Sequence, residues 1–96
     1  MKPSEALQTH REAIRRIVAR HHASNPRIFG SVLYGDDTDN SDLDIIVDTT
    51  DETSLFDIGA IHAELTELLG VKIDVLTPGS LPDRWKEDAL SEARAV

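Results

Sequence analysis

The spacing of apolar residues changes several times along the chain, and these changes predict the order of its elements. From residue 4 to about residue 22 the apolar positions recur at helical spacing, with Ser4 as the expected N-cap. The apolar face of this helix consists of Leu7, Ile14, Ile17 and Val18. Asn25-Pro26 should end the helix, because proline lacks an N–H and the residue before it disfavours helical geometry.

Three later segments have the composition and alternation of strands. They are residues 27–29, 43–48 and 71–76. Between the first two, a helical turn is expected over residues 32–34, followed by a turn-rich segment, Gly35 to Ser41.

Two further helices follow from local signals. Ser54 and Asp57 have capping-box spacing, and Gly70 is placed to cap the end of the helix that they begin. A last helix is expected from residue 81 to about 93, after a second capping-box pair, Ser80 and Asp83. Its inward-facing residues would include Leu81 and Trp85. This order predicts an α/β (α+β) fold, a small mixed sheet with flanking helices, in one domain over residues 1–96.

The strand at residues 43–48 carries the first candidate chemistry. Residues two apart on a strand share a face, so Asp42 and Asp44 point one way while Leu43, Ile45 and Val47 point the other. Two carboxylates on one side of a rigid element suit Mg²⁺ or Mn²⁺, which bind through one or two carboxylates plus substrate phosphates. The pattern therefore predicts a divalent cation site.

A third carboxylate, Asp74, lies among aliphatic residues in the strand at 71–76. Burying it unpaired would be costly, so it either meets a cation or lies exposed at a strand end. Gly30-Ser31, at the end of the strand at 27–29, allows two interpretations as well. It is an ordinary turn, or a close approach of backbone N–H groups to a phosphate.

The net charge of −8 is unevenly distributed. Between Arg27 and Lys72 there is no Lys or Arg, although the interval is rich in Asp and Glu. Such a block disfavours direct DNA binding, which depends on cationic side chains. It leaves three explanations for the acidity, namely solubility, a basic protein partner, or bound divalent metal at Asp42 and Asp44.

Other features narrow the class of protein. The absence of cysteine excludes disulfides and thiolate metal sites. The sequence shows no signal-like segment and no apolar run of membrane-spanning length, so we expect a cytoplasmic protein without membrane contact. An EF-hand read from Asp37 fails, because its sixth position is Asp42 rather than Gly and its twelfth is Asp48 rather than Glu.

Two other metal or phosphate motifs also fail. A haloacid dehalogenase type of Asp-x-Asp needs an apolar strand before the pair, and here the strand follows it. The four histidines have no metal-binding spacing on one element, so we expect surface positions for them. They are His10, His21, His22 and His62.

With Gly30-Ser31, Asp42-x-Asp44 and the later Asp74, the sequence resembles the DNA polymerase beta-like nucleotidyltransferases. It is most similar to the minimal nucleotidyltransferase antitoxins, which are encoded beside HEPN-domain toxins in bacteria and archaea. The resemblance covers most of the chain. It implies that Asp42, Asp44 and Asp74 are the catalytic residues and hold two Mg²⁺ ions. It also implies that Gly30 and Ser31 bind the nucleoside triphosphate, with ATP as substrate.

The resemblance further implies an antitoxin of a toxin-antitoxin system resembling type VII. Its activity would be AMPylation, the transfer of AMP from ATP to a tyrosine of a cognate HEPN ribonuclease toxin, with which it would form a hetero-oligomer. One departure leaves an alternative open. Many members carry arginines in the segment that here runs from Gly30 to Gly35, where Val32 and Tyr34 stand instead. A weak or inactive member would neutralise its toxin by direct binding. A third class, modification of a small molecule, usually needs an additional acceptor domain.

Overall fold

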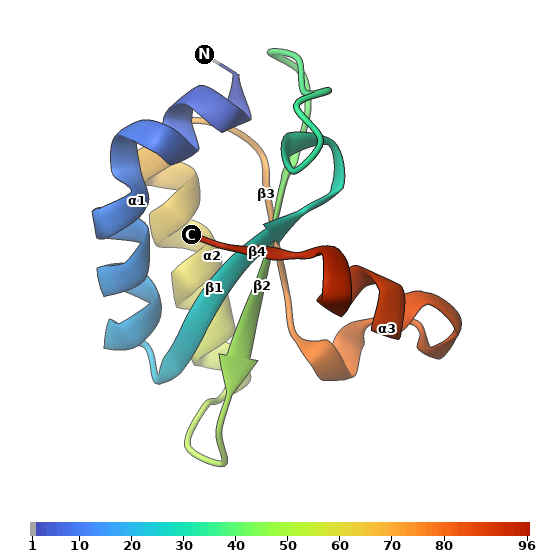
Figure 1. Cartoon of the computed structure of the whole chain (residues 1–96). Coiled ribbons are helices and arrows are strands. Elements are labelled where there is room, and N and C mark those ends of the chain that lie inside the picture. The colour runs from blue at the N-terminus through green and yellow to red at the C-terminus, as the bar shows by residue number, and fades with distance from the viewer. Residues whose placement is uncertain (1) are drawn as a thin grey trace.

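A computed structural model describes residues 2–96 and shows one sheet with helices on both faces (Figure 1). This arrangement confirms the expected mixed α/β (α+β) fold. The elements in chain order are α1 (Pro3–Arg20), β1 (Ala23–Phe29), the 3₁₀ turn η1 (Gly30–Val32), β2 (Leu43–Thr49), α2 (Leu55–Leu69), β3 (Ile73–Leu76), the 3₁₀ turn η2 (Pro78–Ser80), α3 (Asp83–Glu92) and β4 (Arg94–Ala95).

The four strands lie in the order β3-β2-β1-β4. β1 runs antiparallel to both β2 and β4, whereas β2 and β3 are parallel. The parallel pair needs a crossover connection, which α2 supplies. The sheet is therefore mixed, with β2 at its centre between β1 and β3.

The main core lies between the sheet and the helices α1 and α2, which cover the same face (Figure 1). Leu43, Ile45 and Val47 of β2 are fully buried there, which confirms the alternation predicted for this strand. The other face is covered in part by the segment that includes α3, and there Ile46 and Leu81 are buried. The sheet face toward α1 and α2 therefore holds the main core, whereas the opposite face is only partly covered.

The capping residues at both ends predicted α2 correctly. The Ser54 side chain accepts a hydrogen bond from the backbone N–H of Asp57, and the Asp57 carboxylate accepts one from the backbone N–H of Ser54. Gly70 ends the helix in the left-handed conformation, with φ of 67°. No helix within residues 2–96 combines the length and the apolar character needed to cross a bilayer.

The prediction that Ser4 caps α1 is wrong. The helix begins at Pro3, with Lys2 as its N-cap. The backbone N–H of Ser4 instead donates to Asp37 Oδ2 at 2.9 Å, a contact between residues 33 apart in sequence. Asp37 is buried, and the hydrogen bonds from Ser4 hold its pKa below the ordinary value. A carboxylate at a helix N-terminus satisfies an otherwise unpaired donor and the helix dipole.

The boundaries around β1 also differ from the prediction. The helix ends at Arg20, and the strand begins at Ala23 rather than residue 27. It passes through Asn25-Pro26 because the pairing with β2 shifts register between Ser24 and Arg27, and Asn25 has φ of 51°. A bulge of this kind accommodates a proline, which cannot donate to the ladder.

The C-terminal segment departs most from expectation. Ser80 bonds with Thr77 on η2, and the residue before α3 is Pro82, so the predicted Ser80 and Asp83 pair does not cap α3. Leu81 is buried but precedes the helix, while Trp85 is 40% exposed. β4 was not predicted. It pairs with β1, and the backbone N–H of Val96 donates to the Pro26 carbonyl at 2.9 Å.

Two other segments begin two residues away from their predicted starts. The turn after β1 covers Gly30–Val32 rather than residues 32–34, and β3 begins at Ile73 rather than residue 71. Both segments keep the predicted type, so the positions of Gly30 and Asp74 relative to the sheet follow the prediction.

Candidate functional site

Three residues paired across neighbouring strands form a row near one end of these strands, on the sheet face away from α1 and α2. In the parallel pair, Asp44 of β2 lies opposite Asp74 of β3. In the antiparallel pair, Asp44 lies opposite Phe29 of β1. Residues directly paired across strands project to the same face, with Cβ atoms about 4.5–5.5 Å apart in antiparallel pairs. The structure therefore brings Asp74, Asp44 and Phe29 together.

Asp44 is half-buried, and its environment opposes ionisation. Burial, a hydrogen bond with Asp74, and the charges of Asp74 and Asp42 raise the pKa of the Asp44 carboxyl to about 6. A carboxyl surrounded by other carboxyls favours the protonated form when no cation is present. The same arrangement attracts a cation, because a positive charge would relieve the repulsion.

Asp74 is more accessible than Asp44, whereas Asp42 is half-buried like Asp44. Asp42 lies just before β2, with its Oδ2 atom 3.7 Å from Nζ of Lys72 in a largely exposed ion pair. Asp74 is exposed. The exposure agrees with the second interpretation of Asp74, and its contact with a cation stays a prediction.

Gly30 is fixed by its closeness to Asp44. It has φ of 82°, and a Cβ atom placed on it would lie 2.7 Å from Asp44 Oδ2. Both facts require glycine, because an L-residue is strained at this φ and the added carbon would overlap the carboxylate. Ser31 follows in η1 and is half-buried. The Gly-Ser turn thus lies directly beside the carboxylates.

The two residues at the positions where family members carry arginines take different places. Val32 is buried in the core. Tyr34 is 58% exposed, and its hydroxyl donates to Glu92 of α3. This contact, more than any other, raises the pKa of the Tyr34 phenol. Neither residue can supply a positive charge.

The donor set fits a hard divalent cation that is completed by its substrate. Among residues 2–96 no group of three or more His, Asp or Glu side chains is placed to hold a metal ion. Mg²⁺ usually keeps several waters and binds through one or two carboxylates plus substrate phosphates. Asp44 and Asp74, with Asp42 near them, offer oxygen ligands of this kind on an open face.

The histidines, which were expected at the surface and not as metal ligands, lie on other segments. His21 is partly buried and bonds with Glu64, and His22 Nδ1 lies 3.4 Å from Asp57, so these histidines pair with carboxylates. The expectation of plain surface positions is correct for His22 and wrong for His21.

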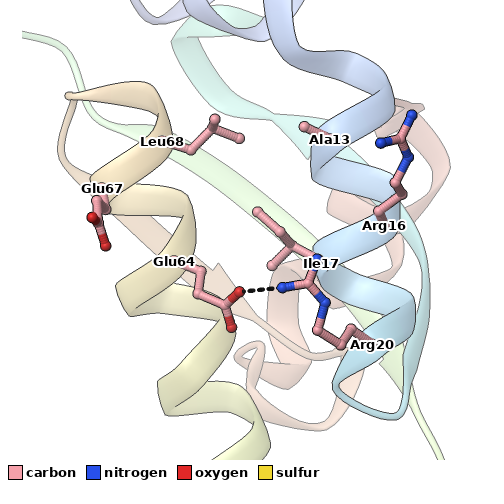
Figure 2. A pocket seen from close by; sticks show the side chains of 7 residues that line it. All are labelled: Ala13, Arg16, Ile17, Arg20, Glu64, Glu67 and Leu68. Carbon is pink, nitrogen blue, oxygen red and sulfur yellow. Dashed lines mark hydrogen bonds and ion pairs between the residues drawn. The ribbon is translucent and has the colours of Figure 1, made fainter.

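A groove of about 350 Å³ between α1 and α2 lies on the opposite side of the sheet (Figure 2). In it Arg20 forms an ion pair with Glu64 at 2.9 Å across the gap between the helices. Its floor is apolar, formed by Ile17 and Leu68. The core separates this groove from Asp44 and Asp74.

Comparisons with known proteins give matches over most of this chain. A family model described as a nucleotidyltransferase domain matches residues 9–96. A Methanocaldococcus jannaschii protein named "putative protein adenylyltransferase" is 36% identical over 77 residues, covering 80% of this chain and 83% of the relative. A solved structure described as a "putative minimal nucleotidyltransferase" is 35% identical, with a TM-score of 0.83 over 97% of this chain and 93% of that one.

A more distant structure supports the fold alone. It is described as a toxin-antitoxin with AMP-PNP, and it is 16% identical, with a TM-score of 0.70 over 97% of this chain and 71% of that one.

Proposed function

The chain belongs to the nucleotidyltransferase domain family, and from this premise we propose that it is an antitoxin with protein adenylyltransferase activity. It transfers AMP from ATP, with Mg²⁺, to a tyrosine of a cognate HEPN ribonuclease toxin and so neutralises the toxin. The single observation that carries the proposal is the register that pairs Asp44 with Asp74, with Gly30 packed against Asp44.

In the proposed reaction the tyrosine oxygen attacks the α-phosphorus of ATP. A bond forms between that oxygen and phosphorus, and the bond from phosphorus to the β-phosphate oxygen breaks, which releases pyrophosphate. The phenolic proton passes to Asp74, the more accessible member of the paired carboxyls. Proton transfer by a positioned group typically contributes about 10²–10⁴-fold to rate.

Asp42, Asp44 and Asp74 would hold two Mg²⁺ ions. Bound there, the ions supply charge stabilisation for the attacking and leaving oxygens of an in-line displacement. Without a cation, carboxylates at these positions would repel a triphosphate, so the proposal requires that ATP enters with its metal.

Gly30 and Ser31 are assigned to the triphosphate. Gly30 lies directly against Asp44, and Ser31 adds a hydroxyl next to it. Backbone N–H groups and a hydroxyl are neutral donors, which suit an anion whose charge is already balanced by metal.

The antitoxin role is supported by likeness only, and the cytoplasmic setting stays an expectation. Relatives at 36% and 26% identity carry a protein adenylyltransferase name, and structural neighbours are toxin-antitoxin structures. Val32 and Tyr34 favour a second candidate, in which the domain neutralises the toxin by direct binding, because neither side chain can bind phosphate as arginine does.

One experiment separates the two. The protein is incubated with ATP, Mg²⁺ and the toxin encoded by the adjacent gene, and the toxin is then weighed by intact mass spectrometry. Transfer predicts a gain of one or more AMP groups on tyrosine, absent in Asp42→Asn and retained in Asp51→Asn, which changes an exposed loop aspartate. A stable complex with unchanged mass would support the binding role instead.

A further inference from the structure

A second hollow adjoins the carboxylate row on the same face of the sheet. It measures about 250 Å³ and lies between the end of β1 and helix α3. Its lining includes Phe29, Gly30, Tyr34, Trp85, Asp88 and Glu92. We refer to it as the α3 pocket.

The α3 pocket is continuous with the site through two residues. Phe29 is the direct cross-strand partner of Asp44, and Gly30 packs against Asp44 Oδ2. Both also line the pocket. A molecule reacting beside Asp44 would therefore extend into this hollow without crossing the core.

The charge of the pocket decides which part of a nucleotide it can hold. Its lining within the described chain contains two carboxylates, Asp88 and Glu92, and no Lys or Arg. Such walls repel phosphate, so the triphosphate must lie on the Gly30-Ser31 side. The neutral end of the nucleotide is the part that these walls can accept.

The volume of the α3 pocket suits one part of a nucleotide rather than a whole nucleotide. Complete small-molecule sites usually measure about 300–1,000 Å³. Trp85 lines the pocket and is 40% exposed, so part of its surface is accessible to a ligand. Base stacking on an aromatic side chain strengthens binding by about 5- to 160-fold.

We propose that the α3 pocket is the nucleobase subsite of this enzyme, with the base stacked on Trp85 and its exocyclic amine donating to Asp88. The inference rests on the proposed use of ATP and adds the residues that recognise its base. Uracil has no exocyclic amine, so the pocket would favour adenine over uracil. The Tyr34 hydroxyl donates to Glu92 and so links α3 to the turn after β1.

The single tryptophan of the chain makes the test direct. Trp85 emission is followed while the protein is titrated with Mg²⁺ and either ATP or inorganic tripolyphosphate. Stacking predicts that ATP changes the emission at saturation, whereas tripolyphosphate binds, as measured by calorimetry, without that change. UTP is expected to bind more weakly than ATP.

Variants extend the test. Calorimetry on Trp85→Leu should show affinity for ATP reduced by about tenfold, from roughly 1.4 kcal/mol of lost stacking, with affinity for tripolyphosphate unchanged. Trp85→Phe should recover most of the loss. Phe56→Leu, which removes a 90% exposed aromatic residue on α2, is the matched control and should leave both affinities unchanged.

Three results would overturn the inference. Equal ATP affinity in Trp85→Leu and the wild type would remove the base from the pocket while leaving the proposed function intact. A Trp85 response to N-acetyl-tyrosinamide but not to ATP would assign the pocket to the acceptor. If neither ATP nor tripolyphosphate bound, the proposed function would fail together with the subsite.

Discussion

Asp44→Asn should make the metal-free protein more stable at neutral pH while removing its activity. The ionised Asp44 carboxylate is opposed by burial, by Asp74 and by Asp42. Asparagine has nearly the same shape, carries no charge, and can donate a hydrogen bond to Asp74. The substitution therefore removes repulsion without opening a cavity.

The magnitude follows from the change in pKa. The folded value of about 6 lies above the ordinary value of 3.8. At about 1.36 kcal/mol per pKa unit, ionisation in the folded state costs about 3 kcal/mol more than in the unfolded chain. Because Asp44 is only partly buried, solvent screening reduces this to an expected gain of about 1–2 kcal/mol for Asp44→Asn at about pH 7.5.

The direction of the Asp44 pKa shift determines the pH range in which the stability difference appears. The folded protein holds the proton more tightly than the unfolded chain, so this contribution to stability is complete below pH 3.8 and is lost as the pH rises through about 6. The difference between Asp44→Asn and the wild type should thus be near zero below that window and reach its full value above it.

Urea denaturation in EDTA, repeated across this pH range, measures the difference. Asp48→Asn is the matched control on the same strand and face. Asp48 pairs with Arg27 at 2.7 Å, so its neutralisation should lower stability by up to about 1 kcal/mol. Adding Mg²⁺ should stabilise the wild type but not Asp44→Asn, since only a ligand of the folded state raises stability.

The prediction is contradicted if Asp44→Asn is less stable than the wild type in EDTA at a pH above about 6. It also fails if the two proteins differ by the same amount at every pH. Either result would mean that the carboxyls of the row do not repel one another.

Three further substitutions test other parts of the structure. Gly30→Ala should destabilise the protein by about 1–3 kcal/mol in urea denaturation and remove activity, because of the left-handed φ and the overlap with Asp44. Asp37→Ala should cost about 1 kcal/mol at neutral pH by uncapping the Ser4 N–H, and this loss should shrink in acid as the wild-type carboxylate is protonated below 3.8. Ser54→Ala should cost about 1 kcal/mol, measured by thermal or urea denaturation, with no effect on ATP binding.

The parts of the fold that sequence predicted are those specified by neighbouring residues. The alternation from Leu43 to Val47 fixed which side of β2 faces the core, and therefore where Asp44 points. Ser54, Asp57 and Gly70 fixed α2 because caps act within one helical turn. The resemblance implied one site for Asp42, Asp44 and Asp74, and the register places Asp74 directly opposite Asp44.

The missed features depend on contacts between distant segments. Asp37 caps α1 from 33 residues away, and no local pattern near Ser4 announces it. The strand continues through Pro26 because β2 and the C-terminal Val96 supply partners on either side of the bulge. Phe29 gained its place beside Asp44 through pairing alone, so the α3 pocket could not be anticipated from spacing.

The central position of β2 ties the assembly of the site to folding itself. If β2 slipped by one residue, every aliphatic side chain of its inner face would exchange places with an aspartate or another outward-facing residue. Carboxylates would then enter the core unpaired, at a cost of several kcal/mol each. Sheets with β2 in the wrong register are therefore unstable. A molecule whose core is fully packed also has its acidic groups in the native register.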